Sequence, residues 1–296
     1  MQRIVPCLWF DHAAAEAADF YGSVFPDARI IDTHNYPTEG LPEFQREFAG
    51  KALTVDFEIS GYRFLALNAG PEFPVNPSIS FMLNFDPSLG PDARSHLDAL
   101  WSALVDGGEV QMPLGDYGFS PRYGWLRDRY GIGWQLILAN PEGEPRPFVT
   151  PSLLFTTPVQ NRAEEAITFY AEVFGGRVGT LARYPEQTGP AAHGALMYSD
   201  VELLGQWFAA MDSGVALDYT FNSGISLMVS CADQAEIDRY WEQLSSVPDA
   251  EACGWCADRF GVRWQIIPAN MGDLMAKPRA YDRLLAMKKI EIADFG

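Results

Sequence analysis

Two segments of this 296-residue chain carry nearly the same sequence. Trp125–Ile137 reads WLRDRYGIGWQLI and Trp255–Ile267 reads WCADRFGVRWQII, with seven of thirteen positions identical. Most of the remaining pairs are conservative, so chance does not explain the match. A repeat of this length indicates a chain built from two copies of one structural unit. Any binding site is therefore expected either between the two copies or once in each of them.

The repeat extends along most of the chain, with an offset that shrinks toward the C-terminus. Ala17–Phe25 (AADFYGSVF) matches Ala166–Phe174 (AITFYAEVF) at an offset of 149, whereas the Trp125 motif recurs at an offset of 130. The largest single step falls just before the terminal motif. The first copy is therefore expected to carry an additional loop within Gly107–Tyr123.

Apolar spacing predicts the same order of elements in each copy: a strand, a helix, three strands, a strand, a second helix and two final strands. Besides the final strands, the predicted strands span 4–10, 30–36, 52–59, 63–68 and 79–85 in the first copy and 152–156, 177–184, 195–199, 203–209 and 225–230 in the second. Asn161 and Asp233 are interpreted as helix N-caps with glutamate partners three residues on. Gly107 is interpreted as a helix stop.

The domain organisation follows from the repeat. We expect a first domain at 1–143, a second at 148–272 and a C-terminal helix within 273–296, with its helical residues at about 278–290. The connection between the domains, 140–147, reads NPEGEPRP and is rich in proline, glycine and charge.

Composition narrows the classes of partner. The net charge of −18 disfavours nucleic acid, because phosphate binding requires clustered Lys and Arg, and it disfavours anionic membrane surfaces. The sequence contains no apolar run of about 18 residues and no signal-peptide pattern. Four cysteines fit a reducing compartment. We therefore expect a cytoplasmic protein that binds neither nucleic acid nor membrane.

Three motifs together resemble the vicinal-oxygen-chelate superfamily, which includes glyoxalases, bleomycin-resistance proteins and extradiol dioxygenases. They are the FY-x-x-VF helix, the GG-x-V-x-MPLGD segment at Gly107–Asp116, and the D-R-[YF]-G-[IV]-x-WQ ending. The PhnB-like branch resembles the chain most. This resemblance implies an α+β fold: a tandem, duplicated glyoxalase-like arrangement of paired βαβββ modules whose curled mixed sheets enclose a cleft.

The resemblance also implies where a metal would bind. In metal-dependent relatives the terminal motif reads D-x-x-G-x-x-x-E, and its Glu binds the metal; this chain has Gln135 and Gln265 at that position. The first strand, which often supplies a His, offers only Cys7 when a one-residue slip is allowed. We therefore expect no metal or other cofactor. Gln135, Gln265, His193 and Cys7 remain weak candidates for a divalent ion, since amide oxygens are neutral and weaker ligands than carboxylates.

Further candidates concern the cleft itself. Trp134 and Trp264 are predicted either to stack on a flat ligand or to pack in the core. The Gly107–Tyr123 loop, with Asp116, Tyr117 and Phe119, is predicted to be a lid or a specificity element, with simple variation in loop length as the alternative. His193 lies in a region that supplies a His in some relatives. The Cys253-x-x-Cys256 pair is interpreted as structural thiols, because no second pair follows.

Two functions from different classes follow from these residues. The first is the binding or sequestering of a small organic molecule without a full metal site. The second is a metal-dependent lyase, isomerase or dioxygenase acting on a small oxygenated substrate. The sequence argues against methyl transfer, because the Gly175–Gly176 pair follows a helix and is interpreted as a C-cap. The protein is expected to be a monomer or a homodimer.

Overall fold

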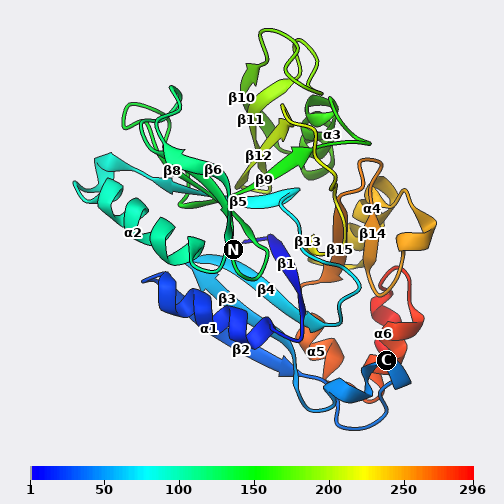
Figure 1. Ribbon diagram of the computed structural model, residues 1–296. Helices are drawn as coiled ribbons and strands as arrows, with labels where there is room; N and C mark the ends of the chain where they lie inside the picture. Colours follow the sequence, from blue (N-terminus) through cyan, green and yellow to red (C-terminus); the bar gives the residue numbers. More distant parts are fainter. Residues whose placement is uncertain (1) are drawn as a thin grey trace.

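The computed structural model describes residues 2–296, apart from the side chain of Phe44. The chain forms two mixed β-sheets with helices packed on them (Figure 1). Four modules account for nearly all elements. Module 1 contains β1 (Ile4–Asp11), α1 (Ala14–Val24), β2 (Ala28–Asn35), β3 (Ala52–Ile59) and β4 (Tyr62–Ala69); module 2 contains β5 (Ile79–Phe85), α2 (Ala93–Val105), β6 (Glu109–Gly115), β7 (Tyr123–Arg127) and β8 (Gly133–Leu138). Module 3 contains β9 (Val149–Phe155), α3 (Ala163–Phe174), β10 (Arg177–Arg183), β11 (Leu196–Leu203) and β12 (Gln206–Asp212); module 4 contains β13 (Ile225–Cys231), α4 (Gln234–Leu244), β14 (Trp255–Ala257) and β15 (Arg263–Pro268).

Each sheet combines one module from each half of the chain. Sheet A has the strand order β14-β15-β13-β1-β4-β3-β2, and sheet B has the order β10-β11-β12-β9-β5-β8-β7-β6. The halves meet in antiparallel pairs, β1 with β13 and β5 with β9. The predicted α+β fold of paired modules is confirmed. The two sequence repeats, however, are not separate layers, because each contributes strands to both sheets.

Module 4 differs from the other three. The predicted loop at Gly107–Tyr123 contains strand β6, which pairs with β7, so only about seven residues of that segment form a loop. Module 4 has no counterpart of β6 within residues 2–296. Instead, the backbone N–H groups of Cys253 and Gly254 donate to the carbonyls of Met287 and Lys288 at 2.8 and 2.7 Å. The C-terminal segment thus occupies part of the edge that β6 covers in module 2.

The C-terminal segment is less helical than predicted. It contains α5 (Met271–Met275), α6 (Ala280–Ala286) and the 3-10 helix η4 (Ile292–Phe295). The helix expected over 278–290 ends at Ala286, because the carbonyls of the next two residues accept the bonds from Cys253 and Gly254. Other 3-10 turns are η1 (Glu43–Phe48), η2 (Pro87–Leu89) and η3 (Pro248–Ala250).

Other local expectations have mixed outcomes. Asp233 caps α4 as predicted, accepting from the backbone N–H of Glu236 at 2.9 Å. Asn161 does not cap α3: its side chain accepts from the backbone of Ala192, and the buried Asp212 carboxylate accepts from the first residue of the helix. The last two strands of module 3 lie further along the chain than predicted. Their turn falls at Leu204–Gly205, where both residues have positive φ, as in a tight hairpin.

Each copy of the doubled motif binds one helix, α1 or α3, to the hairpin that carries the motif. The Asp128 carboxylate accepts hydrogen bonds from the Tyr21 hydroxyl at 2.9 Å and the Trp134 indole at 2.8 Å. It also accepts from the backbone N–H groups of Tyr130 and Ile132. Module 4 repeats this arrangement around Asp258. The tyrosine of the FY helix and the Asp and Trp of the terminal motif therefore form one buried latch in each half.

This latch bears on the two interpretations of the paired tryptophans, stacking on a ligand or packing in the core. Trp134 and Trp264 are fully buried on the side of each sheet that faces the helices. Their indole N–H groups are used by the two aspartates, so core packing, and not contact with a ligand, explains both. Burial raises the pKa of Asp128 and Asp258, and the hydrogen bonds that they accept oppose part of that rise.

Candidate functional site

The face of each sheet away from helices α1–α4 carries a small polar centre, and we call this face the inner face. In sheet B the Gln135 amide donates to the Ser80 hydroxyl at 2.9 Å, and the Tyr123 hydroxyl donates to the Gln135 carbonyl at 2.8 Å. Ser152 lies directly opposite Ser80 where β5 pairs with β9. The two halves of the chain therefore both contribute to this centre.

Two polar atoms beside this centre have no hydrogen-bond partner within residues 2–296. They are Nε1 of Trp125 and Oγ of Ser152, and both are buried. A methyl group added to Gly133 would lie 2.9 Å from Cβ of Ser80 and 3.5 Å from Nε1 of Trp125. The indole N–H therefore lies over Gly133, next to Ser80. The Trp125 indole N–H and the Ser152 hydroxyl thus remain unpaired on the two sides of Ser80.

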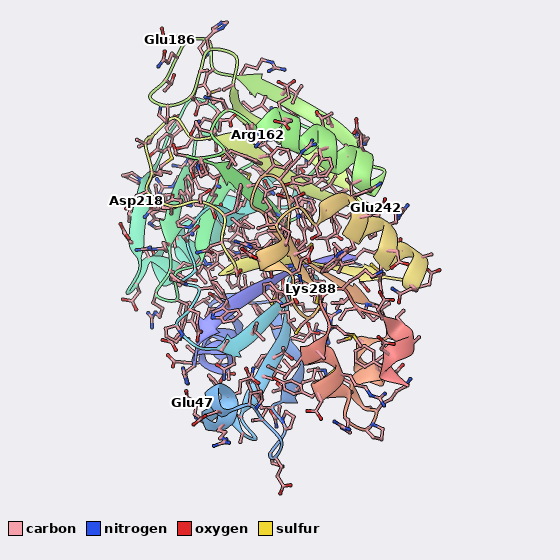
Figure 2. The ribbon with its side chains drawn as sticks, turned by 90° about the vertical axis from the view of Figure 1, so that its right-hand side faces the viewer. Glu47, Arg162, Glu186, Asp218, Glu242 and Lys288 are labelled. Atoms are coloured by element: carbon pink, nitrogen blue, oxygen red, sulfur yellow. The ribbon has the colours of Figure 1, made fainter. Side chains whose placement is uncertain are left out.

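Apolar side chains surround the centre of sheet B. They form a cluster that is separate from the main core, with Tyr123, Trp125 and Leu154 buried and Met112, Tyr117, Ile137, Met211, Leu217 and Tyr219 partly exposed. Two loops supply its margins, 116–122 from the first half and 213–224 from the second. Figure 2 shows Asp218 of the second loop beside the blue-green strands of module 2. The inner face of sheet B is therefore aromatic, rich in methionine and only partly covered.

Sheet A has an equivalent centre with different chemistry. The Gln265 amide donates to the Ser226 hydroxyl at 2.9 Å, and Cys7 lies opposite Ser226 where β1 pairs with β13. Cys7 thus occupies the place of Ser152. Its burial raises the pKa of the thiol to about 11, although hydrogen bonds from Gln265 and Ser226 oppose the rise. This thiol stays protonated at neutral pH.

Other elements border the inner face of sheet A. Trp9 packs edge-on against Phe73 and Trp255, with ring centroids 4.9 and 6.2 Å away. Helix α6 spans from module 1 to module 4, because the Tyr281 hydroxyl donates to the Gln45 side chain at 2.7 Å and the residues after α6 bond to the strand edge before β14. Figure 1 shows α5 and α6 on the side of sheet A away from α1.

The donor set does not fit a divalent metal of the glyoxalase type. The centre of sheet B offers a neutral amide with three hydroxyls, and that of sheet A offers an amide with one hydroxyl and a protonated thiol. Such ions are held instead by imidazole and carboxylate ligands. Within residues 2–296 no three His, Cys, Asp or Glu side chains group in a way that could hold a metal. Gln135 and Gln265 lie on different sheets, and Cys7 joins only Gln265.

The remaining sequence candidates lie at the margins. Tyr117 belongs to the sheet B cluster and lies beside Phe119, whose side chain is 64% exposed; their ring centroids are 5.9 Å apart. Asp116 is exposed and caps its own turn by accepting from the backbone of Gly118. His193 is exposed in the loop between β10 and β11, and no hydrogen bond or ion pair within residues 2–296 joins it to either centre. Cys253 is partly buried and Cys256 fully buried, which agrees with structural thiols.

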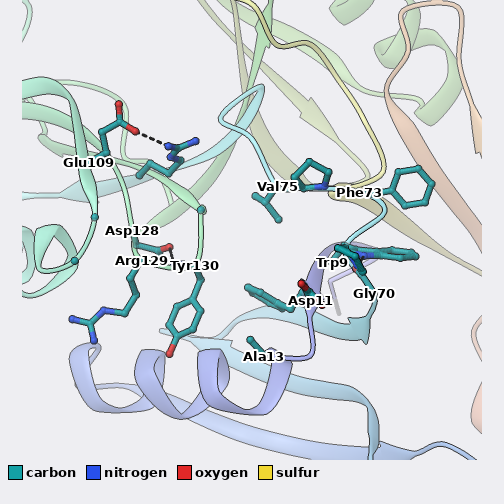
Figure 3. A pocket seen from close by; sticks show the side chains of 17 residues that line it. Trp9, Asp11, Ala13, Gly70, Phe73, Val75, Glu109, Asp128, Arg129 and Tyr130 are labelled. Atoms are coloured by element: carbon teal, nitrogen blue, oxygen red, sulfur yellow. Dashed lines mark hydrogen bonds and ion pairs between the residues drawn. The ribbon is translucent and has the colours of Figure 1, made fainter. Parts of the chain in front are cut away.

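A groove of about 560 Å³ lies where module 1 meets module 2 (Figure 3). Trp9, Phe73 and Val75 line one wall, and Arg127 and Arg129 line the other. The charges of the second wall are already paired within the chain, Arg127 with Glu109 at 2.6 Å and Arg129 with Asp106 at 2.6 Å. This groove therefore offers fewer unpaired groups to a ligand than the inner face of sheet B does.

Sequence reasoning missed Ser80, Ser152 and Trp125. A signal for Ser80 was present, because Ser78–Leu83 (SISFML) and Gly224–Val229 (GISLMV) repeat a serine at the same place. The pairing of Ser80 with Ser152 could not be read from the repeat, since it joins strands from opposite halves.

The paired modules that share two sheets define a protein with a glyoxalase-like fold. The model of the 3-demethylubiquinone-9 3-methyltransferase family matches residues 2–137 and 147–267, so the chain belongs to that family. Glyoxalase I from Zea mays is 10% identical, with 92% of this chain and 96% of that one covered and a TM-score of 0.56. That likeness concerns the fold alone.

A PhnB protein from Bacillus cereus is 30% identical over 47% of this chain and 100% of its own length, with a TM-score of 0.40. Comparison with curated proteins gives no match. Within residues 2–296, no helix is both long enough and apolar enough to span a membrane.

Proposed function

We propose that this protein binds a small, planar, uncharged organic molecule with hydrogen-bonding oxygens, of the phenol or quinone class, on the inner face of sheet B. The observation that carries the proposal is the pair of buried, unpartnered polar atoms beside Ser80, Nε1 of Trp125 and Oγ of Ser152. Leaving a buried polar group unpaired costs about 1–3 kcal/mol, so a ligand that satisfies both gains that free energy on binding.

The surroundings of these two atoms support a planar ring. Trp125, Tyr123 and Tyr219 offer aromatic surfaces, and the flexible methionines 112 and 211 can adapt to a ring edge. Oxygens of a phenol or quinone can accept from the Trp125 indole and exchange hydrogen bonds with the Ser152 hydroxyl. The charged side chains nearest to Tyr219 of this cluster are Arg127, Glu109 and the exposed Asp218. Arg127 and Glu109 pair with each other at 2.6 Å, which favours a neutral ligand. The family description, which names a demethylubiquinone, agrees with this class.

Methyl transfer is not part of the proposal, because the chain does not fit the methyl donor that the family description implies. Enzymes using S-adenosylmethionine bind it at a glycine-rich turn between a strand and a helix. Within residues 2–296, the strand-to-helix junctions contain at most the single Gly90. Gly175 instead follows α3 with a φ of 65°, as a helix C-cap. We therefore propose binding, and derive no step through that cofactor.

Calorimetric titration with guaiacol and hydroquinone tests the proposal. Trp125→Phe keeps the ring and removes the N–H group, so we expect at least tenfold weaker binding, equivalent to about 1.4 kcal/mol. Trp255→Phe is the matched control, because it changes the counterpart residue on sheet A. Cyclohexanol, which lacks the planar ring, should bind more weakly than either phenol. Equal effects of the two substitutions, or wild-type protein that binds neither phenol, would refute the proposal.

A further inference from the structure

Arg263 differs from the other shielded arginines of this protein because it has no partner. Arg3, Arg122 and Arg146 each form an ion pair with an acidic side chain at 2.5–2.8 Å. Within residues 2–296, no ion pair or hydrogen bond involves the Arg263 guanidinium, and its Nε is buried without an acceptor. In a chain with 39 acidic residues, an unpaired and partly buried guanidinium requires an explanation.

Strand alternation places Arg263 on the inner face of sheet A. It lies two residues before Gln265, whose amide contacts Ser226 on that face, and Trp264 between them points into the core. The register of β13 with β15 places it beside Ser226. The repeat aligns Arg263 with Gly133, over which the Trp125 indole lies in sheet B. The two inner faces therefore differ by a charge at equivalent positions.

The electrostatics around Arg263 favour an anion. Burial lowers the pKa of this guanidinium, and the charge of Asp258 acts against that effect from a distance. Asp258 cannot serve as its partner, because its oxygens already accept from Tyr170, Trp264 and two backbone N–H groups. A guanidinium remains charged under all ordinary conditions and matches a carboxylate or phosphate in a two-point hydrogen bond.

We propose that the inner face of sheet A is a second binding site, which takes a small organic anion whose carboxylate or phosphate pairs with Arg263. The apolar part of this ligand packs against the edge-on pair of Trp9 and Trp255. Because α6 spans this face from Gln45 to the strand edge before β14, the ligand is small. The site is independent of the neutral site proposed for sheet B and selects for charge.

Calorimetric titration with benzoate, phenyl phosphate and the neutral benzamide tests this site. We expect wild-type protein to bind at least one of the two anions at least tenfold more tightly than benzamide. Arg263→Gln should remove that preference, whereas Arg263→Lys should keep part of it. Arg94→Gln, which removes an exposed arginine that forms no ion pair within residues 2–296, is the matched control and should change nothing. Thermal unfolding of each unliganded variant separates a loss of binding from a loss of folding.

The outcomes divide clearly. Anion binding that disappears in Arg263→Gln but persists in Trp125→Phe supports the second site. Anion binding that is equal in wild type and in a folded Arg263→Gln, or no preference of the wild type for either anion over benzamide, overturns it. Because guaiacol binding depends on Trp125 and not on Arg263, failure of one site leaves the test of the other intact.

Discussion

Tyr21→Phe provides a test of the latch around Asp128. The hydroxyl of Tyr21 donates to the Asp128 carboxylate at 2.9 Å, and both groups are buried. A hydrogen bond to a charged group contributes about 1.5–3 kcal/mol, so the substitution should lower the free energy of unfolding by about that amount. Urea unfolding followed by tryptophan fluorescence gives this value, provided that the slope with urea is unchanged.

Tyr130→Phe is the matched control for that prediction. Its hydroxyl also bonds to a carboxylate, that of Glu16 at 2.9 Å, but this contact is exposed. We expect a change within about 0.5 kcal/mol, as for most surface substitutions. Tyr170→Phe, which removes the equivalent bond to Asp258, should repeat the loss seen for Tyr21→Phe. If the buried and the exposed substitutions cost the same, the latch does not hold the helix to the hairpin as we infer.

Three further predictions concern the Asp128 carboxylate, two of the cysteines and two ion pairs. Because burial raises the pKa of Asp128, the folded state takes up this proton at a higher pH than the unfolded state. The contribution of Asp128 to the free energy of unfolding therefore rises as the pH falls toward the ordinary carboxyl pKa of about 3.9. Urea unfolding of wild type and Asp128→Asn at several pH values should show this rise as a growing difference in stability, and a flat or falling difference would contradict it. A thiol reagent should modify the partly buried Cys253 in the folded protein and reach Cys7 only on unfolding, and early labelling of Cys7 in a mass spectrum would count against its placement. Arg146→Ala leaves the buried Asp200 carboxylate unpaired and should cost about 3–5 kcal/mol, whereas Arg29→Ala, at an exposed pair, should cost at most about 1 kcal/mol by urea unfolding.

The duplication and the module order could be predicted because each leaves a local pattern in the sequence. The FY helix and the terminal motif recur because the same buried latch is built twice, around Asp128 and Asp258. The pairing of modules 1 with 4 and 2 with 3 could not be predicted, since it depends on contacts between strands that are far apart in the chain. Long-range register leaves no periodic signal in a single sequence.

The site was only partly predictable for the same reason. Gln135 and Gln265 were located because they belong to the repeat, and each proves to bond to a serine on a neighbouring strand. Trp134 and Trp125 lie on opposite faces of sheet B, Trp134 in the main core and Trp125 in the smaller cluster. The motif alone does not distinguish a tryptophan that binds an aspartate from one that faces a ligand. The charge of Arg263 becomes informative only when the surrounding acidic groups are known to be engaged elsewhere.

A crystal structure of the protein soaked with hydroquinone tests the central claim most directly. The proposal predicts a ring on the inner face of sheet B, with one oxygen within hydrogen-bonding distance of Trp125 Nε1 or Ser152 Oγ. A ring bound instead in the groove between modules 1 and 2, with the inner face of sheet B filled by its own side chains, would contradict the proposal.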